Sequence, residues 1–195
     1  NFMGLENIVE KSEVEIAEDF RYILSVGSLT ENKNQSLLID VFSELKKEQN
    51  IPEKLVLIGE GKERENLENK IKNLGMEKEI FLLGARLNPY NYIKRAELYI
   101  VTSKEEGFSL TTLEAMTLKT MVIATKTDGT REILGEDSKY GKLVENSKEE
   151  LKKEIAYYLK NIDKRREYEE LAYKRAHDFS KENAVAKIEE FIDKL

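Results

Sequence analysis

Short apolar runs alternate with longer segments of helical periodicity along most of this chain. The runs predicted to be strands are 22–26, 54–58, 80–83, 98–101, 121–124 and 142–144. The segments predicted to be helices are 36–47, 64–74, 90–95, a stretch beginning at 110, 130–134, 148–161, 163–178 and 181–194. Short buried strands joined by helices are typical of a parallel sheet covered on both faces. We therefore predict an α/β fold, a doubly wound parallel sheet with helices on both faces.

Composition excludes several classes of protein. The 195 residues suffice for one domain with a substantial core, and the net charge of −6 without a basic tract argues against a nucleic-acid partner. No apolar run approaches the roughly 20 residues that cross a bilayer, and we expect a cytoplasmic protein. Cysteine is absent, and the single histidine, His177, cannot form a metal cluster by itself. We expect no metal site and no cofactor.

The stretch from Ser103 to Met116 carries the strongest chemical signal. It follows the apolar run 98–101, turns at Gly107 and enters a predicted helix after Ser109. Unpaired N–H groups and the helix dipole make such a helix start an anion site. Carboxylates at Glu106 and Glu114 flank it. This combination favours a ligand with both phosphates and hydroxyls, such as a nucleotide sugar.

The predicted helix places Glu114 on an apolar face. With Ser109 as the cap and Leu110 as the first helical residue, Leu110, Leu113 and Leu118 fall near one face, and Glu114 lies among them. A carboxylate there is costly unless a partner satisfies it. A pair of ribose hydroxyls is one such partner. The alternative is that Glu114 lies at the edge of the stripe and meets a lysine or water.

Glycines follow four predicted strands, at 27, 59, 84 and 107. In doubly wound sheets, ligands bind at the carboxyl ends of the strands. Lys33 closes the first of these loops at the start of a predicted helix, where a cation is unfavourable unless an anion is also present. The alternative is a solvated loop lysine.

This pattern resembles the E-x7-E signature of retaining glycosyltransferases with the GT-B fold, of the family 4 (group 1) type. The matching residues are Ser103, Glu106, Gly107, Phe108, Leu110, Leu113, Glu114, Ala115 and Met116, and Ser109 replaces a glycine. Further matches lie at 25–27, 33, 58–61, 81–84, 121–125 and 129–133. The resemblance runs in order along nearly the whole chain. It implies the carboxyl-terminal, donor-binding half of such an enzyme.

The resemblance implies transfer of a hexose-type sugar from a nucleoside diphosphate to an acceptor hydroxyl, with retention and without a required metal, in cell-surface polysaccharide or glycan synthesis. It implies that Glu106 orients the donor sugar as the catalytic residue. The residues that it assigns to the donor are Gly27, Ser28, Lys33, Arg86, Leu87, Gly107, Phe108, Ser109, Leu110 and Glu114.

Some details of the donor site stay open. The resemblance implies that Lys33 binds the diphosphate and that Glu114 binds the ribose. In the family an arginine commonly stands where this chain has Ser28, so we expect phosphate binding to be weaker or to depend on other residues. The resemblance also implies that the backbone of the loop at Arg86 and Leu87 meets the nucleobase. Such recognition leaves the base open, and we expect a UDP-sugar.

We expect three segments: an interdomain linker over 1–19, a Rossmann-like nucleotide-sugar-binding domain over 20–178, and a carboxyl-terminal helix over 179–195. The chain begins at Asn1, which fits an excised half of an enzyme; a start at Met3 is the alternative. The expected partners are a nucleotide sugar, the amino-terminal domain of the same enzyme, and a glycan or lipid-linked glycan acceptor. That other half would supply any peripheral association with the inner face of a membrane, and this fragment alone would be inactive.

Two other functions fit the same fold. One is half of a sugar-nucleotide epimerase, and the other is a non-catalytic nucleotide-binding module, which Ser28 favours. The phosphate-binding motif fails, because no Gly-Lys-Ser/Thr run follows Gly27 at the required spacing. The dinucleotide-binding motif fails, because the loop at Gly59 lacks the third glycine.

Overall fold

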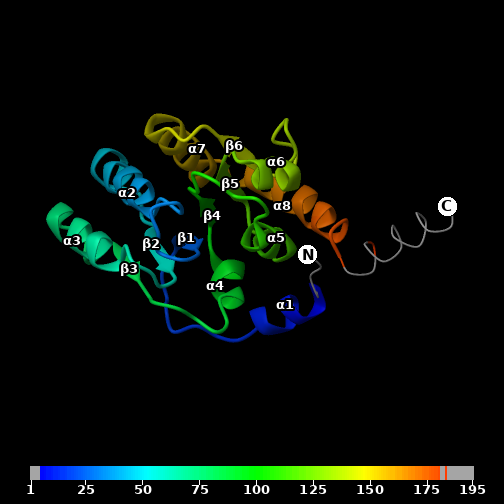
Figure 1. Ribbon diagram of the computed structural model, residues 1–195, viewed down its shortest axis with the longest axis horizontal. Helices are drawn as coiled ribbons and strands as arrows, with labels where there is room; N and C mark the ends of the chain where they lie inside the picture. Colours follow the sequence, from blue (N-terminus) through cyan, green and yellow to red (C-terminus); the bar gives the residue numbers. More distant parts are fainter. Residues whose placement is uncertain (1–4, 181–182, 184–195) are drawn as a thin grey trace.

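The computed structural model describes residues 5–180 and residue 183. Its centre is a six-stranded parallel sheet with the strand order β3-β2-β1-β4-β5-β6 (Figure 1). The strands are β1 (Tyr22–Val26), β2 (Lys54–Ile58), β3 (Ile80–Leu82), β4 (Leu98–Val101), β5 (Val122–Thr125) and β6 (Lys142–Val144). The predicted doubly wound parallel sheet is confirmed.

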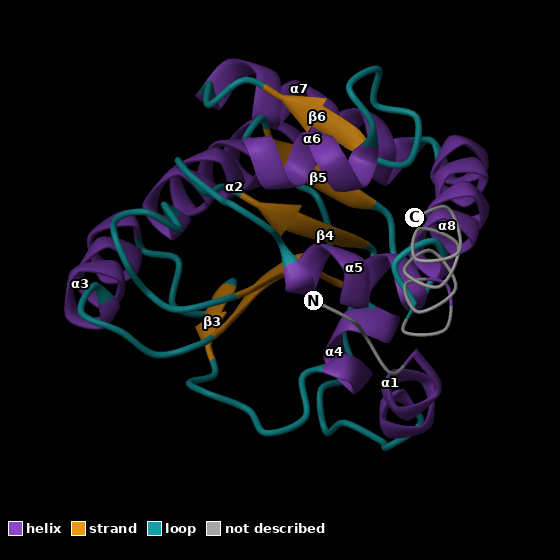
Figure 2. Ribbon diagram, turned by 45° about the vertical axis from the view of Figure 1, so that its right-hand side comes forward, coloured by secondary structure: helices purple, strands orange, loops and turns teal. Residues whose placement is uncertain are grey.

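Helices cover both faces of this sheet (Figures 1 and 2). They are α1 (Leu5–Ser12), α2 (Gln35–Gln49), α3 (Arg64–Leu74), α4 (Tyr90–Arg95), α5 (Leu110–Thr117), α6 (Asp128–Leu134), α7 (Lys148–Lys160) and α8 (Ile162–His177). α2, α3 and α7 pack on one face, and α1, α4, α5, α6 and α8 pack on the other. The helix expected over 181–194 lies outside the described residues.

Two hydrophobic cores form because successive strand side chains point to opposite faces. In β1, Ile23 packs with α2, α3 and α7, whereas Leu24 packs with α4 and α5, and both are fully buried. Strands buried on both faces read as continuous apolar runs, which is why their positions were predictable. α6 begins two residues before the predicted start at 130, because Thr127 and Thr130 form a capping box.

The order of the strands creates a crevice at the carboxyl edge of the sheet. After β1 the chain moves outward to β2, whereas after β4 it moves to β5 in the opposite direction. β1 and β4 pair directly, with Ile23 opposite Leu98 and Leu24 opposite Tyr99. The loops that follow these two strands therefore diverge, and ligands of doubly wound sheets bind at such a switch point.

The segment expected as a linker contains helix α1, which packs against α4 and α5. Its Ile8 is only 5% exposed, and the side chain of Asn88 donates a hydrogen bond to the carbonyl of Lys11 at 2.8 Å. The domain boundaries at 19 and 178 stay predictions. Among the helices of residues 5–180, none is long and apolar enough to cross a membrane.

Candidate functional site

The loop after β1 forms one wall of the crevice. Its Gly27 donates a backbone hydrogen bond to Ile58 at 2.9 Å, and Leu29 donates one to Glu60 at 2.9 Å. A Cβ at Gly59 would lie 1.9 Å from the carbonyl oxygen of Gly27, so only glycine fits there. The loops after β1 and β2 therefore pack directly against each other. This contact holds Gly27 at the mouth of the crevice, while the neighbouring Ser28 is exposed.

Glu106 and Lys33 meet across the crevice. Lys33 Nζ lies 2.5 Å from Glu106 Oε2, and the hydroxyl of Ser103 donates to the same oxygen at 2.8 Å. The two charged side chains are 26% and 13% exposed, respectively. Lys33 is thus paired and largely buried, in contrast to a solvated loop lysine. The structure thus brings together Lys33, which is predicted to bind the diphosphate, and Glu106, the predicted catalytic carboxylate.

Glu114 lies on α5, half-buried, with one polar neighbour on α4. The hydroxyl of Tyr90 is 3.3 Å from Glu114 Oε1. Burial raises the pKa of Glu114, and the Tyr90 hydrogen bond opposes this shift. A carboxylate that is short of hydrogen-bond donors is suited to bind the hydroxyls of a ligand.

The predicted apolar stripe on α5 is wrong at one position. Leu113 and Leu118 are buried, but Leu110 is 41% exposed. Leu110 is the first residue of the helix and lies at the carboxyl edge of the sheet, where the core no longer covers the helix. Its exposure places it at the mouth of the crevice.

Helix α5 begins at the crevice as predicted, with Ser109 at the cap position. Its side chain makes no cap hydrogen bond; its hydroxyl instead accepts from the hydroxyl of Thr112 at 2.8 Å. The first N–H groups of a helix have no partner within the helix. The loop of Gly107 and the start of α5 can therefore donate to an anion.

The loop after β3 carries the predicted nucleobase residues. Arg86 and Leu87 are exposed, and Arg86 lies beside the hydroxyl of Tyr92 on α4. The same loop leads directly to Tyr90, which contacts Glu114. The predicted base and ribose residues thus lie on connected segments, although the structure shows no direct contact of Arg86 with Glu106 or Glu114.

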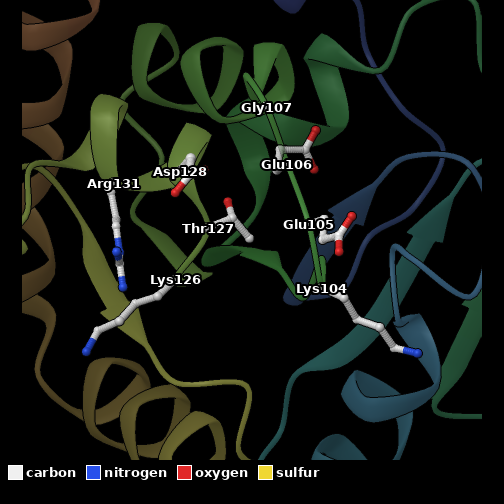
Figure 3. Close-up of a pocket in the computed structure, with 8 residues that line it drawn as sticks. All are labelled: Lys104, Glu105, Glu106, Gly107, Lys126, Thr127, Asp128 and Arg131. Carbon is white, nitrogen blue, oxygen red and sulfur yellow. The ribbon is translucent and has the colours of Figure 1, made fainter.

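A cavity of about 430 Å³ opens on the other side of the Glu106 loop (Figure 3). Figure 3 shows Thr127 and Asp128 between the loop of Glu106 and Gly107 on one side and Arg131 on the other. The residues that line it are Lys104, Glu105, Glu106, Gly107, Lys126, Thr127, Asp128 and Arg131. Our sequence reasoning gave no site role to the four residues contributed by the loop after β5 and by α6, although the matching segment 129–133 includes Arg131. The glycine at 129 was the available signal.

Gly129 explains how this second loop reaches Glu106. Its N–H donates to the carbonyl of Glu106 at 2.8 Å. A Cβ at position 129 would lie 2.8 Å from that oxygen and equally close to the backbone of Gly107 and Phe108. The absence of a side chain lets α6 approach the backbone of the loop.

Comparison with known proteins identifies the family. The model of the family "Glycosyl transferases group 1" matches residues 7–175. The chain is 36% identical over 183 residues to N-acetylgalactosamine-N,N'-diacetylbacillosaminyl-diphospho-undecaprenol 4-alpha-N-acetylgalactosaminyltransferase of Campylobacter jejuni, covering 93% of this chain and 49% of that protein. It spans about a quarter to a half of the length of such curated relatives.

Solved structures show the same fold. One is the C-terminal domain of the glycosyl transferase group 1 family protein LpcC from Francisella tularensis, with a TM-score of 0.70, 26% identity, and 80% of this chain and 84% of that chain covered. Anabaena Alr3699/HepE in complex with UDP has a TM-score of 0.79 at 23% identity, covering 90% of this chain and 49% of that chain. This chain belongs to the group 1 glycosyl transferases, and the domain built on its sheet has the fold of the carboxyl-terminal half of a GT-B enzyme.

Proposed function

We propose that this chain is the donor-binding domain of a retaining glycosyltransferase that takes a sugar from UDP and transfers it to a hydroxyl of a glycan or lipid-linked glycan. The observation that carries the proposal is the placement of Lys33, Glu106 and Glu114 around the start of α5, at the switch point of the sheet. An anion site flanked by two carboxylates matches the chemistry of a nucleotide sugar.

In this proposal the diphosphate lies at the start of α5. Backbone N–H groups from Gly107 to Leu110 and the ammonium of Lys33 stabilise the negative charge that grows on the leaving UDP as the glycosidic bond breaks. The acceptor oxygen forms the new bond to the anomeric carbon, and its proton is released. No metal is required, because helix and lysine supply the positive charge.

The two carboxylates have separate roles. Glu114 accepts hydrogen bonds from the ribose hydroxyls, which stabilise its charged form against burial. Glu106 orients the donor sugar and stabilises positive charge near the anomeric carbon. When the diphosphate binds, Lys33 turns from Glu106 towards phosphate, and Ser103 keeps its hydrogen bond to Glu106.

Two comparisons support the choice of donor. The HepE structure is a complex with UDP, and the Campylobacter relative is named as an N-acetylgalactosaminyltransferase acting on an undecaprenol-linked glycan. We therefore propose a UDP-linked N-acetylhexosamine as the donor and a cell-surface glycan as the product class. The acceptor would be held with the help of an amino-terminal domain.

Calorimetric titration of the chain with UDP, GDP, ADP and CMP tests the donor site. We expect saturable binding of UDP and a loss of about 1–3 kcal/mol in Glu114→Ala, because charged hydrogen bonds to the ribose are removed. Glu105→Gln is the control, since the exposed side chain of Glu105 lies in the loop before α5, outside the proposed donor contacts. The proposal would be contradicted if Glu114→Ala bound UDP as tightly as the wild type, or if the wild type bound no nucleotide at millimolar concentration.

A further inference from the structure

A single asparagine joins the two loops that line the crevice. Asn32, in the loop after β1, donates from Nδ2 to the carbonyl of Glu105 at 2.9 Å, and its Oδ1 accepts from the N–H of Glu105 at 3.1 Å. Its own carbonyl accepts from the N–H of Lys104 at 2.8 Å. The carboxamide thus satisfies both backbone groups of the residue that immediately precedes Glu106.

These bonds set the register between the loops. Next to Asn32, the carbonyl of Lys33 accepts from the hydroxyl of Thr102 at 2.7 Å, and its ammonium pairs with Glu106. Consecutive Cα atoms lie about 3.8 Å apart, so a slip of one residue between the loops is of that size. Because the usable range of hydrogen-bond distances is a few tenths of an ångström, such a slip would separate Lys33 from Glu106.

The rest of the loop is fixed from the opposite side. The N–H of Gly129 bonds to the carbonyl of Glu106, and the hydroxyl of Thr125 bonds to the carbonyl of Ser103 at 2.6 Å. On the side of β1, the backbone of the loop is held by Asn32 and the side chain of Glu106 is held by Lys33. When Lys33 binds a diphosphate and leaves Glu106, Asn32 keeps its two hydrogen bonds to the backbone of Glu105.

Asn32 is exposed, so its bonds compete with water and contribute little to global stability. Their effect is on geometry. Asn32 is also absent from the residues that match the family signature in this loop, which are Gly27 and Lys33. A primary amide is needed, since aspartate keeps the acceptor but loses the donor, and alanine loses both.

We propose that Asn32 is a positioning residue, which acts through the backbone of Glu105 to hold the Glu106 carboxylate in place for the donor sugar. This inference rests on the proposed function of Glu106. It predicts that loss of the amide impairs recognition of the sugar and spares recognition of the nucleotide, because the nucleotide contacts lie at Lys33, α5 and Glu114.

The test compares the affinities of the chain for UDP and for UDP-N-acetylgalactosamine. We expect Asn32→Ala and Asn32→Asp to weaken binding of the sugar nucleotide about tenfold while changing the affinity for UDP less than about twofold. The proposed function predicts the same pattern for Glu106→Gln. The double variant Asn32→Ala/Glu106→Gln should be no weaker than Glu106→Gln alone. Glu31→Gln is the control. Glu31 lies next to Asn32 in the loop after β1, and the substitution removes only its exposed ion pair with Lys104.

Amide hydrogen exchange at Glu105, whose N–H is bonded to Asn32, separates the two proposals. Equal weakening of both ligands, additivity with Glu106→Gln, or wild-type affinities in both Asn32 variants would overturn the role of Asn32. If Glu106→Gln leaves the affinity for the sugar nucleotide unchanged, or UDP does not bind, the proposed function fails. Exchange then decides for Asn32. Faster exchange of the Glu105 amide in Asn32→Ala, which lacks the acceptor, at an unchanged melting temperature supports the proposed contact of Asn32 with the loop, and unchanged exchange refutes it.

Discussion

The Lys33 ammonium and the Ser103 hydroxyl both bind the same oxygen of Glu106. In the proposed function Lys33 exchanges this partner for the diphosphate. We expect Lys33→Met to weaken UDP binding by about 1.5–3 kcal/mol, the usual contribution of a charged hydrogen bond. Lys104→Met serves as the control, because Lys104 pairs with the exposed Glu31. Equal effects of the two substitutions in calorimetry would show that Lys33 acts only through general charge.

Glu114 gives a prediction about pH. Burial raises its pKa in the folded chain above the value of the unfolded chain, so the native state binds the proton more readily. The stability associated with this proton is present in acid and is lost as pH rises through the raised pKa. We therefore expect Glu114→Gln to raise the melting temperature at pH 7, with a gain that vanishes below the pKa of an ordinary glutamate. A lower melting temperature for this variant at pH 7 would contradict the account.

The same titration affects binding. Because the carboxylate form of Glu114 is the proposed acceptor for ribose hydroxyls, UDP affinity should fall as pH decreases, starting at a higher pH than for an exposed glutamate. Calorimetry of the wild type and Glu114→Gln across pH 4–8 measures this. The part of the decrease in UDP affinity that is due to protonation of Glu114 should be absent in Glu114→Gln.

At the level of elements, α6 and the Glu106 loop depend on a glycine at their contact. A methyl group at Gly129 would collide with backbone atoms of residues 106–108, which cannot move as a flexible side chain does. We expect Gly129→Ala to destabilise the chain by about 1–3 kcal/mol. Gly107→Ala is the matched control for stability, because a Cβ there meets open space. Thermal unfolding that is unchanged in Gly129→Ala would show that α6 can shift away.

The elements were largely predictable, and their ends were less so. Apolar runs located all six strands because both of their faces are buried. The start of α6 depends on hydrogen bonds between Thr127 and Thr130, which carry no periodic signal. The error at Leu110 has a similar origin, since a stripe pattern assumes that a helix is covered along its whole length, and α5 emerges from the core at its first residue.

At the scale of the whole molecule, the candidate site brings together residues that lie far apart in the sequence. Asn32 and Glu105 are 73 positions apart, as are Lys33 and Glu106. The resemblance to a family anticipated Lys33, Glu106 and Glu114 one by one. It gave no sign of Asn32, or of the cavity walls formed by the loop after β5, because those contacts depend on which strands are adjacent in the sheet.

The hydrophobic core beneath α5 supports this site. Met116 on α5 is fully buried beneath the helix whose first turn is the proposed anion site. Met116→Ala is expected to cost about 2–5 kcal/mol of folding free energy. Urea unfolding measures this cost, and a loss below about 1 kcal/mol would show that the α5 face of the core is loosely packed.

The most direct test of the central claim is an NMR titration of the chain with UDP, read at assigned backbone amides. The account predicts the largest shift changes at Lys33, at residues 106–110 and at Glu114, with smaller changes around Arg86, all at the switch point of the sheet. Changes that are largest at Lys126 and Arg131, with Glu114 unmoved, would place the nucleotide in the cavity beside α6 and contradict the account.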